Sequence, residues 1–95
     1  MERNLIMTKV IVYDKDNCPK CLHTEMQLKA RGVQFETKNI FDEENSNILE
    51  WAQITGNRTM PLVFVDGKFA WGDNRPDKVE ELAEWWVKYR VEWKK

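Results

Sequence analysis

Residues 9–21, KVIVYDKDNCPKC, decide the fold of this chain. The β-branched, apolar segment from Thr8 to Tyr13 is typical of a short strand buried at the centre of a sheet. The two cysteines follow after a few polar residues. Pro19 suits the first turn of a helix, the apolar positions after it fit helical spacing, and Gly32 suits the position just past a helix end. The stretch therefore predicts a strand that leads through C-x-x-C directly into a helix.

The rest of the chain continues to alternate strands and helices. The elements expected are a half-buried strand over 33–40, a helix over 48–55 ended by Gly56, a strand over 62–65, a hairpin turn at Asp66-Gly67, a strand from Lys68 to Trp71, and a long helix over 77–94 that opens with a capping box, Asp77-x-x-Glu80. The order βαβαββα predicts an α/β fold with a four-stranded mixed central sheet flanked by three helices. Its first two strands are expected to be parallel and its last two antiparallel.

Length and charge narrow the function classes. Ninety-five residues fit one domain, with residues 1–7 expected to be a loosely ordered extension. The chain has 15 Lys and Arg against 16 Asp and Glu, so no general field attracts it to nucleic acid or anionic membranes. Neither a spanning segment nor a signal peptide is recognisable, and we expect a cytoplasmic protein. In that compartment a C-x-x-C pair is more often catalytic or metal-binding than structural.

Cys18 is expected at or just before the first helical residue. Free backbone N–H groups and the helix dipole favour an anion there, and such positions lower a thiol pKa from about 8.5 to roughly 3.5–7.5. Lys15 and Lys20 favour the thiolate, whereas Asp14 and Asp16 oppose it. We therefore expect a moderate lowering of the Cys18 pKa.

Cys21, one helical turn later and less exposed, is the expected resolving thiol. Cys18 would attack a target disulfide, and Cys21 would then release the reduced target, with no bound cofactor or metal. Two alternatives stay open: a structural pair of buried and spare thiols, and a binding module in which the cysteines hold zinc or bridge an iron–sulfur cluster between two chains. Zinc needs four ligands, and His23 is expected on a different helix face.

Two separated motifs resemble the glutaredoxins of the thioredoxin superfamily. VYDKDNCPKC (12–21) is similar to the opening of a glutaredoxin, and TGNRTMPLVFVDGK (55–68) is similar to the segment in which glutaredoxins carry R-T-V-P. The resemblance runs from about Lys9 to Glu84 and implies a thioredoxin-like fold and thiol–disulfide oxidoreductase activity. It also implies a cis peptide before Pro61, which would face the cysteines, and backbone hydrogen bonds from Met60 to the substrate chain.

The segment FAWGDNRPDKVEEL (69–82) resembles two subfamilies. The NrdH-redoxins carry W-S-G-F-R-P-D here; Trp71, Arg75, Pro76 and Asp77 match, and Gly72, Asp73 and Asn74 depart. This resemblance, which we favour, implies electrons from a thioredoxin-reductase-like flavoprotein and delivery to ribonucleotide reductase or similar protein disulfides. In that family the loop occupies surface that glutathione would otherwise use, and the departures lie in this loop.

The alternative is a glutathione-dependent glutaredoxin. Gly72-Asp73 preserves part of the Gly-Gly-Asp pattern that binds the α-carboxylate and amine of glutathione. The cations Lys15 and Arg58 would complement the glutathione carboxylates. Against it, Lys20 replaces the usual Tyr, and Trp71 would crowd the groove unless it packs on the last helix. Beside the cysteines, the substrate-binding residues implied are Lys15, Pro19, Lys20, Arg58, Thr59, Met60, Pro61, Trp71, Gly72 and Asp73.

The last helix carries a stripe of apolar side chains. Val79, Leu82, Trp86, Tyr89 and Trp93 follow helical spacing, so the first half should pack on the sheet while the end overhangs. We expect Trp93 to fold onto the core edge and the protein to be a monomer. The alternative is a dimer or partner contact made by the clustered aromatic side chains.

Overall fold

The computed structural model describes residues 9–94, with side chains described over 9–86. The expected extension over 1–7 lies outside the described residues, and the packing expected for Tyr89 and Trp93 lies outside the described side chains. Within the described part, none of the helices combines the length and apolar character that a membrane crossing requires.

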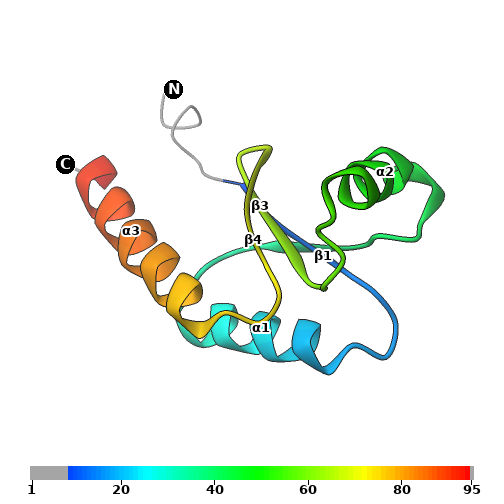
Figure 1. Cartoon of the computed structure of the whole chain (residues 1–95). Helices are drawn as coiled ribbons and strands as arrows, with labels where there is room; N and C mark the ends of the chain where they lie inside the picture. The colour runs from blue at the N-terminus through cyan, green and yellow to red at the C-terminus, as the bar shows by residue number, and fades with distance from the viewer. Residues whose placement is uncertain (1–8, 95) are drawn as a thin grey trace.

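A four-stranded sheet forms the centre of the molecule (Figure 1). Its strands are β1 (Val10–Asp14), β2 (Glu36–Asn39), β3 (Leu62–Val65) and β4 (Lys68–Gly72), in the spatial order β2-β1-β3-β4. β1 and β2 are parallel, and β1 with β3 and β3 with β4 are antiparallel. The predicted mixed sheet and its central first strand are confirmed.

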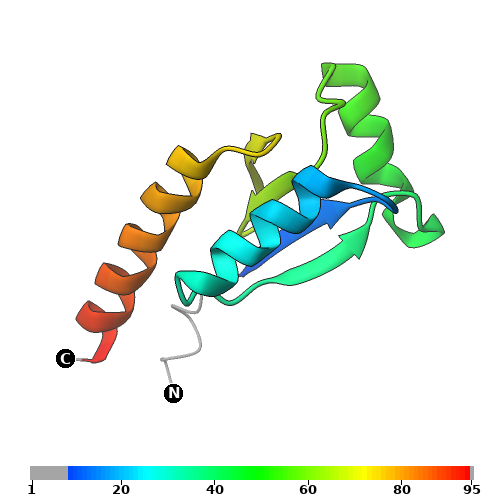
Figure 2. The same cartoon turned by 90° about the horizontal axis from the view of Figure 1, so that it is seen from below.

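Helices cover both faces of the sheet. They are α1 (Pro19–Ala30), α2 (Ser46–Thr55), preceded by the short 3₁₀ turn η2 (Glu43–Asn45), and α3 (Pro76–Lys94). Figures 1 and 2 show α1 and α3 on one face of the sheet and α2 on the other. This is the thioredoxin-like arrangement that the resemblance implies.

The alternation of β1 side chains explains why its sequence is apolar from Val10 to Tyr13. Val10 and Val12 belong to one buried cluster, with Leu28 of α1 and residues of α3, whereas Tyr13 belongs to a second cluster with Ala52 of α2. A central strand buried on both faces needs apolar residues at every position. The end of β1 that leads to the cysteines is therefore held between two packed layers.

The second strand is shorter than predicted. It begins at Glu36, and Thr37 within it is exposed, because β2 lies at the edge of the sheet. Val33 and the half-buried Phe35 reach the core from the segment before it. The alternation of apolar residues over 33–40 thus predicts which residues contact the core, but it does not predict where the strand begins and ends.

The predicted capping box of the last helix is wrong. α3 begins at Pro76, so Asp77 lies inside the first turn, and its carboxylate accepts hydrogen bonds from the Arg75 guanidinium at 3.1 and 2.9 Å. Val79, Leu82, Ala83 and Trp86 are buried, which confirms that the first half of the helix packs on the body. The Asp77 carboxylate, at the second helical position, therefore pairs with the residue just before the helix and is not its N-cap.

Candidate active site

Cys18 is the N-cap of α1, as the sequence predicts. Its backbone is extended (φ −120°, ψ 94°), and its sulfur accepts a hydrogen bond from the Cys21 N–H at 3.2 Å. Asn17 before it has φ 55°, a left-handed conformation that Asn tolerates better than most residues. The strand, the tight turn and the Pro19-initiated helix together place this sulfur at the positive end of the helix dipole.

Cys18 and Cys21 form a disulfide, with their Cα atoms 5.2 Å apart. Cys18 is partly exposed, whereas Cys21 is 3% exposed and belongs to the cluster beneath α2. The structure therefore represents the oxidised form of the pair. Its exposed member is the one at the helix terminus.

The cis-proline segment shares the cluster that holds the cysteines. The Met60–Pro61 peptide is cis, as the resemblance implies, and both residues are buried. Met60 and Cys21 lie in one apolar cluster, against which Cys18 packs. The R-T-M-P segment thus joins the cysteine end of the molecule.

The segment after β4 is tied to the cis-proline segment by its backbone. Asp73 donates its N–H to the carbonyls of Thr59 (3.1 Å) and Pro61 (2.9 Å). A Cβ at Gly72 would lie 3.2 Å from Leu62 Cδ2 and 3.4 Å from the Thr59 carbonyl oxygen, so this close approach favours glycine. The two segments predicted to flank the substrate are therefore in contact.

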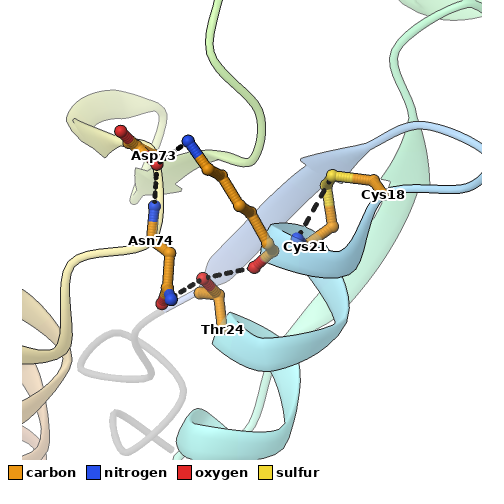
Figure 3. A network of polar contacts seen from close by, with 6 residues as sticks. Cys18, Cys21, Thr24, Asp73 and Asn74 are labelled. Atoms are coloured by element: carbon orange, nitrogen blue, oxygen red, sulfur yellow. Dashed lines mark hydrogen bonds and ion pairs between the residues drawn. A yellow bond between two sulfur atoms is a disulfide. The ribbon is translucent and has the colours of Figure 1, made fainter.

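A polar network links this segment to α1 (Figure 3). Lys20 Nζ lies 3.2 Å from Asp73 Oδ1, which also accepts the Asn74 N–H at 2.6 Å. The Thr24 hydroxyl is shared between the Lys20 carbonyl (3.0 Å) and Asn74 Oδ1 (3.3 Å). We call Lys20, Thr24, Asp73 and Asn74 the loop cluster. The Asn74 N–H, and after it Lys20, hold the pKa of Asp73 below its usual value.

A second polar group lies along the same helix. Asp14, at the end of β1, and Glu25, on α1, line a hollow together with both cysteines. Burial first, and then the hydrogen bond and charge of Asp14, raise the pKa of Glu25 to about 7. Its Oε2 is buried and has no hydrogen-bond partner among the described residues. We call Asp14 and Glu25 the carboxyl pair.

The structure gathers most of the predicted substrate-binding residues around the cysteines. Lys15 borders the cysteine hollow and also a second depression, lined by Arg58 and Met60. Arg58 continues into a third depression, which Thr59, Gly72 and Asp73 also line. Pro19 and Lys20 are exposed in the first turn of α1. Neighbouring depressions therefore share lining residues, Lys15 between the first two and Arg58 between the last two.

Trp71 is placed differently from the other predicted substrate-binding residues. Its side chain is 5% exposed and belongs to the buried cluster that includes Val79 and Trp86 of α3. The packing alternative therefore describes the bulk of this side chain, and Trp71 also borders the third depression.

His23 is exposed on α1, as expected. Among the side chains described over 9–86, no group of three or more His, Cys, Asp or Glu residues is placed to hold a metal ion.

Three residues of the site were missed from the sequence. Glu25 borders the cysteine hollow, and Thr24 contacts Asn74, but Thr24 and Glu25 belong to no motif and Asn74 departs from the one it lies in. Glu25 carried one usable signal, because it follows Cys21 by four residues and so shares its helix face. Thr24 and Asn74 carried none, since their contact joins segments 50 residues apart.

Comparison with known proteins agrees with this geometry. The glutaredoxin family profile matches residues 10–70. A glutaredoxin of Vernicia fordii is 35% identical over 65 residues, covering 66% of this chain and 62% of that protein. The chain thus spans about three fifths of the first curated relatives that it matches, at 62% and 58%.

Two solved structures are similar in both fold and sequence. The NrdH-redoxin of Escherichia coli, described as a glutaredoxin-like protein with a thioredoxin-like activity profile, has a TM-score of 0.66 and 27% identity, covering 78% of this chain and 93% of that one. A buckwheat glutaredoxin in complex with glutathione has a TM-score of 0.61 and 25% identity, covering 96% and 84%. With the cysteine disulfide at the start of α1 and the matching profile, this chain belongs to the glutaredoxin family.

Proposed function

We propose that the protein is a dithiol–disulfide oxidoreductase in which Cys18 attacks and Cys21 resolves. The observation that carries this proposal is the Cys18–Cys21 disulfide at the N-terminus of α1. A thiolate at Cys18 gains the helix dipole and the Cys21 N–H, whereas Cys21 is buried. This asymmetry supports different roles for the two sulfurs.

The cycle transfers two electrons. The Cys18 thiolate attacks one sulfur of a target disulfide, forming a mixed disulfide and releasing the other target sulfur as a thiolate. Cys21 loses its proton and attacks Cys18, so that the Cys18–Cys21 bond forms and the second target thiolate leaves. The target is reduced to two thiols, and the pair is oxidised to the disulfide seen in the structure.

Among possible electron donors we favour a thioredoxin-reductase-like flavoprotein, with ribonucleotide reductase or similar protein disulfides as targets, in the cytoplasm. Two observations support this. The Asp73 carboxylate, which would have to receive the glutathione amine, is already paired with Lys20 and with the Asn74 N–H. The similar NrdH-redoxin is described as thioredoxin-like in its activity profile.

Glutathione is the second candidate donor. Lys15 and Arg58 border one depression beside the cysteine hollow, and two cations there complement the carboxylates of a small anionic thiol. The similar buckwheat glutaredoxin was solved with glutathione bound.

Coupled reduction of the oxidised protein separates the two donors. One reaction contains NADPH and thioredoxin reductase, and the other contains NADPH, glutathione and glutathione reductase. We expect faster oxidation of NADPH in the first. Turnover with glutathione alone would replace the NrdH-like proposal by the glutaredoxin one, and turnover in neither would count against the oxidoreductase proposal.

A further inference from the structure

The carboxyl pair lies on the same face of α1 as the resolving sulfur. Glu25 follows Cys21 by four residues, and residues at this spacing are neighbours on a helix surface. Asp14, at the end of β1, hydrogen-bonds Glu25, and both residues line the hollow that both cysteines also line. The arrangement places an acid–base residue beside Cys21, whose thiolate the helix terminus stabilises less than that of Cys18.

Cys21 lacks the stabilisation of the thiolate that Cys18 has. The Cys18 sulfur accepts an N–H hydrogen bond at the start of the helix, whereas Cys21 is 3% exposed and lies inside the first turn. Burial disfavours the charged form of a thiol. Cys21 must nevertheless lose a proton before it can attack the mixed disulfide.

Glu25 is poised to change its own protonation state. Its Oε2 is buried and lacks a hydrogen-bond partner among the described residues, and Asp14 opposes its ionisation. Lys29, one turn further along α1, acts in the opposite direction, and Lys15 and Asp16 stand at the border of the hollow. Two neighbouring carboxyl groups share a proton more readily than both ionise.

We propose that Glu25, positioned by Asp14, accepts the proton of the Cys21 thiol during resolution of the mixed disulfide. The inference rests on the proposed dithiol cycle and adds the group that drives its second step. The Cys21 proton passes to the Glu25 carboxylate, the Cys21–Cys18 bond forms, and the bond from Cys18 to the target breaks. The target sulfur leaves as a thiolate and takes up a proton, which Glu25 can return.

An aromatic disulfide substrate allows the rates of the two steps, attack by Cys18 and closure of the Cys18–Cys21 bond, to be measured separately. Reduced protein is mixed with 5,5′-dithiobis(2-nitrobenzoate) in a stopped-flow instrument. The first nitrothiobenzoate reports attack by Cys18, and the second reports closure of the Cys18–Cys21 bond. The variants are Glu25→Gln and Asp14→Asn, and Glu50→Gln, an exposed carboxylate on α2, is the matched control.

For Glu25→Gln we expect the second release to slow about tenfold near neutral pH while the first stays within about twofold. The effect is smaller than that of a wholly essential base because water and hydroxide remain as competing acceptors. The wild-type pH profile of the second step should rise through the pKa of Glu25, at about 7, and this inflection should be absent from the variant. Glu50→Gln should match the wild type.

Asp14→Asn gives an independent test that does not remove Glu25. Loss of the neighbouring charge should move the inflection of the second step to lower pH. An unchanged second step in Glu25→Gln, an equal slowing at every pH, or an unmoved inflection in Asp14→Asn would each overturn the inference. If the wild type releases only one nitrothiobenzoate, the proposed dithiol cycle itself fails.

Discussion

The helix that carries the cysteines is flanked by two polar groups of opposite character. In the loop cluster, Lys20 faces Asp73 at 3.2 Å and Thr24 hydrogen-bonds the loop (Figure 3). In the carboxyl pair, Asp14 and Glu25 bring like charges together, and one buried oxygen has no partner among the described residues. One group is electrostatically satisfied and the other is not.

This difference separates two kinds of contribution to a redox site. A satisfied network fixes geometry, because each group is held by a complementary one. The loop cluster accordingly fixes the segment after β4 against α1 and engages the Asp73 carboxylate. The like-charge pair costs stability but raises the pKa of Glu25 to about 7, so Glu25 is able to exchange a proton near neutral pH. We infer that the first sets substrate access and the second assists chemistry.

The largest effect on activity is expected from substitution of the two cysteines, which lie on the helix between the loop cluster and the carboxyl pair. Cys18→Ser should abolish reduction of protein disulfides, because no thiolate remains at the helix terminus. Cys21→Ser should stop dithiol turnover after one attack and accumulate a mixed disulfide. Turnover of a protein disulfide coupled to NADPH oxidation measures both. Full activity of Cys21→Ser would refute the dithiol cycle.

The next largest effect concerns the carboxyl pair and stability. The pKa of Glu25 is raised from 4.5 to about 7, so the stability that accompanies its neutral form is complete below about pH 4.5 and is lost as pH rises through about 7. After allowance for solvent screening, we expect the wild type to lose about 1–2 kcal/mol across this interval. Glu25→Gln should remove most of that loss.

Urea unfolding of the oxidised protein at several pH values measures this change. Glu50→Gln serves as the control, since its carboxylate is exposed on the other face of the sheet. Parallel stability curves for the wild type and Glu25→Gln would mean that the two carboxyl groups do not interact as described.

A somewhat smaller stability effect is expected in the loop cluster. Thr24 is 0% exposed, and Thr24→Val keeps its shape while removing the hydroxyl shared by the Lys20 carbonyl and Asn74. The loss should be about 1 kcal/mol and independent of pH, because no ionisable group is removed. Thr24→Ser, which keeps the hydroxyl, separates the hydrogen bonds from the methyl packing. A loss of stability in Thr24→Val that depends on pH would contradict the distinction between the loop cluster and the carboxyl pair.

The smallest effect is expected from Lys20. Removing its ammonium frees the Asp73 carboxylate, so Lys20→Ala should raise turnover with glutathione about two- to fivefold, in line with an exposed ion pair. Lys68→Ala, at the exposed start of β4, is the matched control. Unchanged or reduced turnover with glutathione in Lys20→Ala would show that the pairing does not limit access.

Much of the fold was predictable because it depends on local signals. β-branched runs, Pro19 at the helix start, Gly56 (φ 80°) after α2, and the Asp66-Gly67 turn, with positive φ at both residues, act over a few residues each. The position of Cys18 at the N-cap followed from the same signals. The bounds of β2 did not, since its place at the sheet edge is a property of the whole fold.

The charges around the site were less predictable than its sulfurs. From the sequence, Lys20 is expected to favour the Cys18 thiolate, yet its ammonium group pairs with Asp73 on a segment 53 residues away. Asp14 is expected to oppose that thiolate, yet it acts on Glu25, which the sequence analysis did not single out. Such pairings depend on tertiary contacts that no local pattern encodes.

The central claim is that Cys18, at the helix terminus, is the attacking sulfur and Cys21 the protected one. Brief alkylation of the reduced protein with iodoacetamide at about pH 6, followed by peptide mass mapping, tests it directly, because only thiolates react. We predict that Cys18 is labelled at least about tenfold faster than Cys21. Equal labelling, or faster labelling of Cys21, would contradict the account.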